Sequence, residues 1–159
     1  MTLWLAGLPL LSSCASASTT RDHGSTSSTP QTALRNRYEA IVETGDRQLS
    51  NLSFRLSADA ANVHAVNADF ARAEKVFDET ATSIQAIQFP ADMGSAVQAM
   101  VSGLRALGST CAEGALASTP AQFHSIQVTV GNAEAAEFKA EHRVNRFLGI
   151  SHIPSAPAG

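Results

Sequence analysis

Two methionines and a cysteine share one predicted helix face, where sulfur atoms could bind a soft metal ion or take part in redox chemistry. Met93, Met100 and Cys111 lie on a single stripe of residues spaced alternately by four and three. Thioether and thiolate sulfurs are the donors that Cu(I) prefers. Methionines seven residues apart also belong to an ordinary apolar seam, and a buried free cysteine behaves as a small hydrophobe. We favour core packing for these residues and keep metal or redox handling as the alternative.

The five histidines do not form a ligand pattern. His64, His124 and His142 each fall beside an apolar seam position, and His23 and His152 lie near the two ends of the chain. Metal ligands must converge on one point, and nothing in these spacings brings the imidazoles together. We predict boundary or surface positions for the first three, and we predict neither a metal site nor a cofactor.

Glu137 is the one charged residue on the apolar stripe of the last predicted helix. A carboxylate at a buried position needs a hydrogen-bonding or charged partner. In an antiparallel bundle Glu137 would lie level with Tyr38 and Arg105, which are the natural partners. Tyr38, Arg105 and Glu137 are therefore the candidate residues of a ligand-binding spot. The alternative is a glutamate at the edge of the seam, whose flexible stem lets the carboxylate reach solvent.

The sequence lacks the motifs of common catalytic and cofactor sites. No glutamate is followed by a histidine three residues later, which a ferritin-like carboxylate site requires. The Cys-x-x-Cys-His, His-Glu-x-x-His, P-loop and Gly-x-Ser-x-Gly motifs are missing as well. We therefore predict that the protein is not an enzyme.

Composition points to one helical domain. The 159 residues include 28 alanines, and only 6% are aromatic, which disfavours an all-β fold. The net charge is −3 at pH 7 and basic clusters are missing, which argues against nucleic-acid binding. Two cysteines are too few for a disulfide scaffold or a four-cysteine zinc site.

Four stretches carry apolar stripes with the alternating spacing of helices in a bundle. The stripes are Tyr38, Val42, Gly45, Leu49, Leu52 and Leu56; Val63, Val66, Phe70, Ala73, Phe77, Thr80, Ile84 and Ile87; Met93, Val97, Met100, Leu104, Leu107 and Cys111; and Phe123, Ile126, Val130, Ala133, Glu137, Ala140, Val144 and Phe147. Helix start and stop signals separate the stripes. A threonine N-cap followed by proline marks a helix start at Thr29-Pro30 and again at Thr119-Pro120. Pro90 marks a stop. Gly149 marks a C-terminal cap on which Ile150 folds back.

We predict an all-α fold, an antiparallel up-down four-helix bundle over residues 30–149. The predicted helices cover about 30–57, 60–88, 91–116 and 120–148. Short connections force consecutive helices to run in opposite directions. An irregular tail is expected at 150–159, where two prolines occur.

An apolar run opens the chain and stops at a cysteine. Leu3–Leu11 is uncharged and too short to span a bilayer core, which favours a signal-peptide h-region. It leads into Leu11-Ser12-Ser13-Cys14, which resembles the lipobox of bacterial lipoproteins: an aliphatic residue, two small residues and the cysteine that becomes lipidated. The resemblance covers only the first 14 residues, and the segment before the apolar run lacks the usual lysine or arginine.

The resemblance implies cleavage after Ser13, a diacylglycerol on the sulfur of Cys14, and further acylation of the new N-terminus, typically with palmitate. Residues 1–13 would then be a lipoprotein signal peptide. Residues 14–29 are rich in serine and threonine and cannot bury enough surface to fold, which predicts a disordered tether. Such tethers are similar to those of actinobacterial lipoproteins, in which they can carry O-linked sugars.

The whole pattern resembles small actinobacterial lipoproteins that combine a lipobox, a tether and an alanine-rich helical bundle. This resemblance implies a location at the outer face of the cell membrane, with the membrane as partner through lipidated Cys14. We predict a non-enzymatic binding or scaffold module for an envelope protein or a small apolar ligand. The alternative is an envelope metal or redox handler that uses Cys111 with Met93, Met100 and a histidine.

Overall fold

Four long helices make up most of the computed structural model, which describes residues 29–58 and 62–150, apart from the side chains of 53–58 and 120. The helices are α1 (Pro30–Ala58), α2 (Val63–Gln85), α3 (Gly94–Ala115) and α4 (Pro120–Phe147), with a short 3-10 helix, η1 (Ala91–Met93), before α3. No strand occurs in these ranges. The prediction of an all-α fold is therefore confirmed for the described part of the chain.

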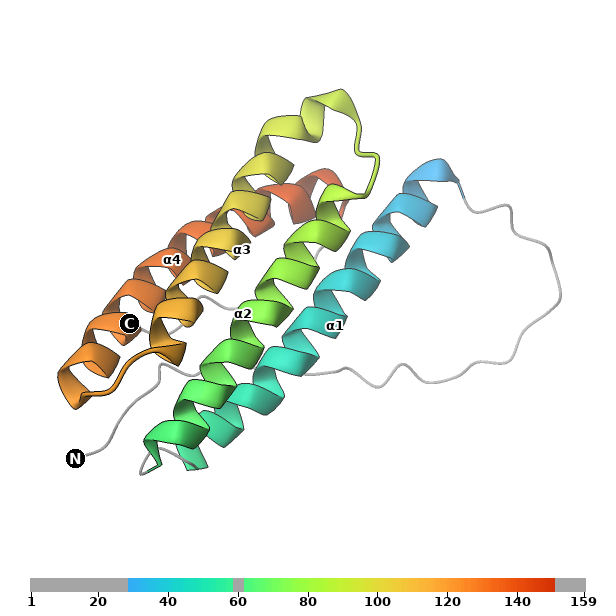
Figure 1. Cartoon of the computed structure of the whole chain (residues 1–159). Coiled ribbons are helices and arrows are strands. Elements are labelled where there is room, and N and C mark those ends of the chain that lie inside the picture. The colour runs from blue at the N-terminus through green and yellow to red at the C-terminus, as the bar shows by residue number, and fades with distance from the viewer. Residues whose placement is uncertain (1–28, 59–61, 151–159) are drawn as a thin grey trace, which may run out of the picture.

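The helices pack side by side along their length (Figure 1). α2 contacts both α1 and α3, and α3 contacts α4. In the view of Figure 1, α1 ends and α2 begins at the lower end, α2 ends and α3 begins at the upper end, and α3 ends and α4 begins at the lower end. The predicted signal peptide and Cys14, most of the tether and most of the tail lie outside the described residues. No helix within 29–58 or 62–150 is both long and apolar enough to cross a membrane.

Local capping signals in the sequence set three of the helix ends. The Thr29 hydroxyl accepts a hydrogen bond from the Thr32 N–H, and Thr119 forms a full capping box with Gln122. At the end of α4, Gly149 has a φ of +67°, and the Ile150 N–H donates to the Asn145 carbonyl at 2.9 Å. This is a Schellman motif, and it brings Ile150 against the core. The predicted caps are confirmed.

The second helix is shorter than predicted. It spans Val63–Gln85, where the expectation was 60–88, and Asn62 is its N-cap. Its last predicted turn unwinds well before Pro90 because Ile87 and Phe89 turn inward, where Ile87 is buried and Phe89 packs against Tyr38. The burial of two large apolar side chains outweighs one further helical turn.

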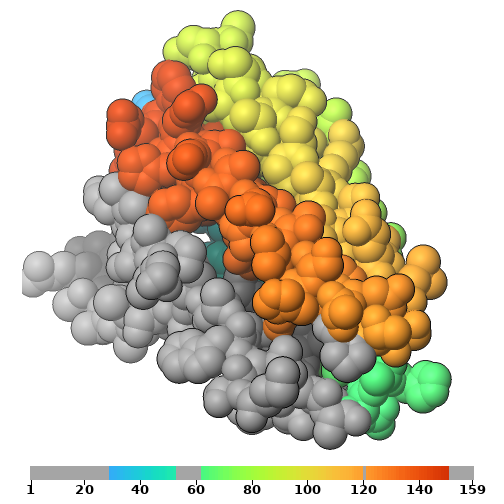
Figure 2. Space-filling view, turned by 90° about the vertical axis from the view of Figure 1, so that its left-hand side faces the viewer, coloured from blue at the N-terminus to red at the C-terminus, as the bar shows by residue number. Residues whose placement is uncertain are grey.

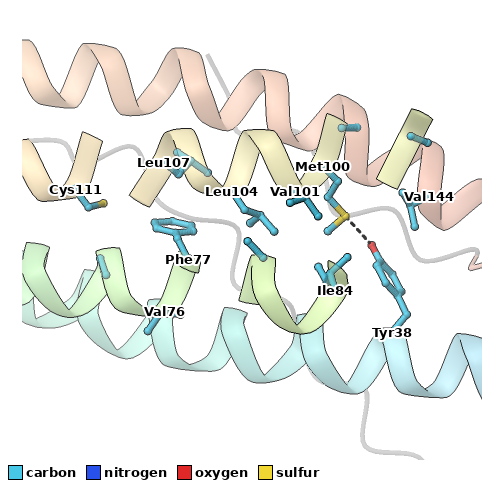
Figure 3. Close-up of a cluster of buried hydrophobic side chains, with 14 of the residues drawn as sticks. Tyr38, Val76, Phe77, Ile84, Met100, Val101, Leu104, Leu107, Cys111 and Val144 are labelled. Carbon is cyan, nitrogen blue, oxygen red and sulfur yellow. Dashed lines mark hydrogen bonds between the residues drawn. The ribbon is translucent and has the colours of Figure 1, made fainter. Parts of the chain in front are cut away.

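The core lies between the helices along the predicted stripes (Figure 3). Tyr38, Ile84, Met100 and Val144 gather at one end of the cluster shown there, and Leu107 and Cys111 lie toward the other. Ile84 and Val144 are completely inaccessible to solvent, and each comes from a different helix. The stripes are not buried over their whole length: Val63 at the start of α2 is 41% exposed and Phe147 at the end of α4 is 48% exposed, because the helix ends lie outside the core.

Glycines allow close approaches between helices. A Cβ atom at Gly45 of α1 would lie 2.7 Å from the Thr80 hydroxyl of α2, and one at Gly108 of α3 would lie 3.1 Å from an Asp78 carboxylate oxygen of α2. A Cβ at Gly114 would lie 2.6 Å from the Phe70 ring. These distances are below ordinary van der Waals contact, so the helices can pack this closely only because no side chain is present.

One asparagine closes the C-terminal end of α3. The side-chain amide of Asn67, on α2, donates to the carbonyls of Gly114, Ala115 and Ala117 at 3.0, 2.7 and 2.9 Å. The last carbonyls of a helix have no partner within the helix. Asn67 therefore ties the start of α2 to the end of α3.

Replacement of Asn67 by alanine is expected to lower the free energy of unfolding by about 1–2 kcal/mol, because these part-buried carbonyls lose their donor. The measurement is urea unfolding followed by circular dichroism at 222 nm. Asn132→Ala is the matched control, since Asn132 is exposed on α4 and the same gain in helix propensity applies. Equal effects of the two substitutions would contradict the capping role.

Candidate functional site

The sulfur-bearing side chains of η1 and α3 are separated core residues. Met93, Met100 and Cys111 are all buried. Eleven residues of helix separate Met100 from Cys111, about 16 Å at 1.5 Å per residue, and Figure 3 shows them far apart. The Met100 sulfur accepts a hydrogen bond from the Tyr38 hydroxyl at 3.5 Å. These three sulfurs therefore cannot converge on one metal ion.

The Cys111 thiol is unreactive in this environment. Burial, followed by the nearby Glu134 and Glu74, raises its pKa to about 12. The thiolate is the form that attacks and binds metal, and it is scarcely populated at neutral pH. Cys111 therefore acts as a small apolar residue of the core.

The histidines of the helices lie at surface or boundary positions, as predicted. His64 and His124 are exposed, and His142 is half-buried beside Phe138, with ring centroids 6.3 Å apart. Among the described residues, no group of three histidine, cysteine, aspartate or glutamate side chains is placed to hold a metal ion. His23 and His152 lie outside the described residues.

Arg105 makes its hydrogen bond to α2, and among the described residues it forms no ion pair with Glu137, the partner expected for it. Its guanidinium donates to the Gln85 side-chain oxygen at 2.6 Å, which links α3 to α2. The reason is helical geometry: Arg105 is two residues from Gly103, so the two positions lie about 200° apart around the helix axis. Gly103 faces α4 and Arg105 faces α2.

Tyr38 is buried at the junction of α1, α3 and the segment before η1. It is 1% exposed, and its ring meets the Phe89 ring edge-on, with centroids 6.3 Å apart. Its hydroxyl donates to Met100 and not to Glu137. Burial is the main cause that raises the pKa of Tyr38, and Glu141, Glu137 and Asp46 raise it further. Tyr38 therefore stays neutral and contributes packing.

Glu137 lies on α4 directly opposite Gly103 of α3. A Cβ atom at Gly103 would lie 2.9 Å from the Glu137 Cβ, so the start of the glutamate side chain occupies the space that a larger residue would fill. Burial, then Glu141, Asp46 and Glu134, raises the pKa of Glu137 to about 8. The carboxyl group is half-buried and forms no hydrogen bond with Tyr38 or Arg105 in the described structure.

Three further carboxyl groups accompany Glu137, and we call the four the carboxylate cluster: Asp46, Glu134, Glu137 and Glu141. Asp46 comes from α1 and the others from α4. Burial first, then Glu141 and Glu43, raises the pKa of Asp46 to about 7. Burial also raises the pKa of Glu134 and of Glu141, although Asn145, which donates to Glu141 at 3.3 Å, lowers the latter. Of the four groups, Asp46 and Glu137 therefore have pKa values close to neutral pH.

Part of this cluster was detectable in the sequence. Glu134, Glu137 and Glu141 lie at spacings of three and four, which places them on one face of a helix. Asp46 follows Gly45, which belongs to a predicted apolar stripe. What the spacing could not reveal is that α1 and α4, far apart in the chain, bring the two sets together.

Comparison with known proteins found no match: no family model, curated protein or solved structure is significantly similar to the chain. Its function must therefore be argued from its own residues.

Proposed function

We propose that the protein is a bacterial lipoprotein, held at the outer face of the cell membrane by a lipidated Cys14, whose helical domain binds an envelope protein without catalysing a reaction. The support from the sequence is the apolar run that ends in Leu11-Ser12-Ser13-Cys14 and the serine- and threonine-rich stretch that follows. Two or more acyl chains hold a protein stably on a bilayer, at about 0.8 kcal/mol per buried CH₂.

The observation that carries the proposal is the environment of the other cysteine. Cys111 is buried, and its thiol is protonated at neutral pH. A protonated, inaccessible thiol is a poor redox group and a poor metal ligand. This environment disfavours metal or redox handling by Cys111, so the lipobox cysteine Cys14 is the one for which the sequence supports a chemical role.

The packing of the helices favours a partner at the surface over an apolar ligand between them. We propose an antiparallel up-down topology in which short connections join neighbouring helices. At Gly45, opposite Thr80, and at Gly108, opposite Asp78, α2 approaches α1 and α3 too closely even for a Cβ atom, which disfavours a ligand at these two points. A protein partner needs only the outer faces of the helices.

Replacement of Cys14 by alanine is expected to move the protein from the membrane fraction to the soluble fraction of a bacterial host that processes lipoproteins. Mass spectrometry of the wild-type protein should show a chain that begins at residue 14 and carries diacylglycerol. The variant should lack the lipid mass, because no sulfur is available for the transfer.

Cys111→Ala is the matched control for this experiment, since it also removes one thiol but leaves Cys14 in place. It should stay in the membrane fraction with the full lipid mass. If Cys14→Ala partitions like the wild type, or if the wild-type protein carries no lipid, the proposed anchoring is wrong.

A further inference from the structure

The chain enters the described structure at one end of the bundle. Thr29 is the first described residue, and α1 starts directly after it, at the upper end in Figure 1. The last turns of α2 and α4, together with η1 and the start of α3, lie at this same end. We call this part of the bundle the entry end, which comprises residues 29–38, 82–98 and 142–150. A segment that precedes Thr29 is therefore attached to the entry end and not to the opposite one.

The charged side chains of the entry end are almost all positive. Arg35 and Arg37 come from α1, and Arg143 and Arg146 come from α4, whereas Asp92 is the one acidic residue in the three ranges. The rest of the described chain has the opposite balance, with eleven acidic and six basic residues. The sequence contains no basic run, so it is the fold that gathers positive charge at one end of an acidic protein.

The two helices that supply the arginines are joined at this end. The guanidinium of Arg35 donates to the Gly149 carbonyl, just beyond α4, at 3.4 Å, and to the Glu39 carboxylate at 3.1 Å. Tyr38 of α1 and Val144 of α4 are both buried in the same apolar core. The basic side chains of α1 and α4 are therefore carried by one packed unit.

The outer face of α4 continues this positive surface. Figure 2 looks onto α4, which runs from orange to red at its end. In its second half the exposed charged residues are Lys139, Arg143 and Arg146, whose spacings of four and three place them on one face. Phe147 follows Arg146 directly, lies one turn beyond Arg143, and is 48% exposed. An exposed aromatic ring beside basic side chains is the combination with which helices bind the surface of anionic bilayers.

We propose that the entry end rests on a bilayer surface that contains anionic lipids. Arg37, Arg143 and Arg146, all exposed, lie toward the lipid phosphate groups, and Phe147 enters the headgroup layer. Each basic side chain near such a surface adds to the attraction, and an apolar ring at headgroup level adds to it by burial. The choice of a bilayer over an acidic protein rests on the proposed lipid anchor at Cys14.

The length of chain before the entry end favours this surface over the rest of the bundle. Fifteen residues separate Cys14 from Thr29. A serine-rich chain of this length spans about 20 Å on average. α1 has 29 residues, so the bundle is about 43 Å long at 1.5 Å per residue. An anchored Cys14 would thus keep the entry end close to the headgroups, while the opposite end could lie well away from them.

Binding of the full chain with Cys14→Ala to lipid vesicles tests the proposal. This variant cannot carry the lipid, so its binding does not depend on whether Cys14 is an anchor. It should sediment more strongly with vesicles of phosphatidylglycerol and phosphatidylcholine than with phosphatidylcholine alone. The preference should fall as the salt rises from about 50 to about 300 mM, because salt screens exposed charges. The apolar run Leu3–Leu11 is the same in every variant, so the comparison of two vesicle types removes its contribution.

Two pairs of substitutions in this background separate the entry end from net charge. Arg143→Gln with Arg146→Gln should lower the affinity for the anionic vesicles by about tenfold or more, since each basic residue near the surface contributes about fivefold. Arg47→Gln with Lys75→Gln is the matched control, because both positions are exposed and lie outside the entry end. It removes the same charge and should change the affinity by less than about twofold. Equal losses in the two pairs would overturn the proposal.

Tryptophan fluorescence shows which end meets the bilayer. Trp4 is the only tryptophan, so Trp4→Phe provides a silent background. Phe147→Trp should then shift its emission to shorter wavelength with the anionic vesicles. Leu116→Trp should not, since Leu116 is 84% exposed at the opposite end of the bundle, between α3 and α4.

Three results would each show that the entry end does not rest on anionic lipid: no preference for the anionic vesicles, no shift from Phe147→Trp, or equal shifts at both positions. None of them bears on the anchor, which is judged separately by the lipid mass of the wild-type protein. Conversely, a wild-type protein without lipid would leave the vesicle measurements on the Cys14→Ala chain fully decisive for the entry end.

Discussion

Tyr38→Ala is expected to lower the free energy of unfolding by about 3–5 kcal/mol, the usual cost of truncating a buried aromatic residue to alanine. Tyr38 is 1% exposed and is among the largest fully buried side chains of the core. It contacts Phe89 and Met100, so its loss leaves a cavity between α1, the segment before η1 and α3. Because single domains are stable by about 5–15 kcal/mol, this one change removes a large part of the total.

Tyr38→Phe is the matched control because it keeps the ring and removes only the hydroxyl group. The hydrogen bond to the Met100 sulfur is a weak one, so the expected cost is below about 1 kcal/mol. Urea unfolding followed at 222 nm is suitable for both variants, since Tyr38 is the only tyrosine and cannot serve as an optical probe after replacement. A loss from Tyr38→Phe as large as that from Tyr38→Ala would mean that the hydroxyl group, and not the packing of the ring, holds this end of the bundle.

Much of the fold could be predicted because its signals are local. The apolar spacing of each helix and the caps at Thr29, Thr119 and Gly149 depend on residues only a few positions apart. The error at the end of α2 arose from contacts distant in sequence, because Phe89 leaves the helix to pack on Tyr38. Local propensity does not contain that information.

The close approach of the helices was harder to predict. Abundant alanine indicates in general that helices can come close together. Approaches that exclude even a Cβ atom occur at Gly45, Gly103 and Gly114. Which glycine is needed depends on the side chain opposite, and that is set by the tertiary packing. Gly131 also lies inside a helix, α4, but a Cβ atom there would have no other atom within 4 Å.

Only part of the candidate site could be predicted from the sequence, for the same reason. Glu137 stood out because it interrupts an apolar stripe, and its proximity to Tyr38 is supported by the effect of its charge on the Tyr38 pKa. The guanidinium of Arg105 bonds to Gln85 of α2 because a helix turns about 100° per residue, so Arg105, two positions after Gly103, faces another neighbour than Gly103 does. The sequence does not single out Asp46, because one of the charges that raise its pKa is Glu141 of α4, about 90 residues away in the chain.

The effects of substitutions at Phe70 and Gly114 on the free energy of unfolding should not be additive, and a double-mutant cycle can measure this coupling energy. The Phe70 ring stacks on Phe123, with centroids 6.2 Å apart, and lies where a Cβ of residue 114 would be. Phe70→Ala alone should cost about 3–5 kcal/mol, because it removes a buried ring that joins α2, α3 and α4.

Whether Gly114→Ala stabilises or destabilises the protein should depend on whether the Phe70 ring is present. In the wild-type background, Gly114→Ala forces a methyl group against the Phe70 ring, and overpacking of this kind costs about 1–3 kcal/mol, partly offset by a gain of about 1 kcal/mol in helix propensity. In the Phe70→Ala background the ring is gone, so the same substitution should stabilise the protein. Gly131→Ala supplies the control, because it meets no other atom and should stabilise both backgrounds equally. If Gly114→Ala has the same effect with and without the Phe70 ring, the contact between them does not limit how closely α2 and α3 pack.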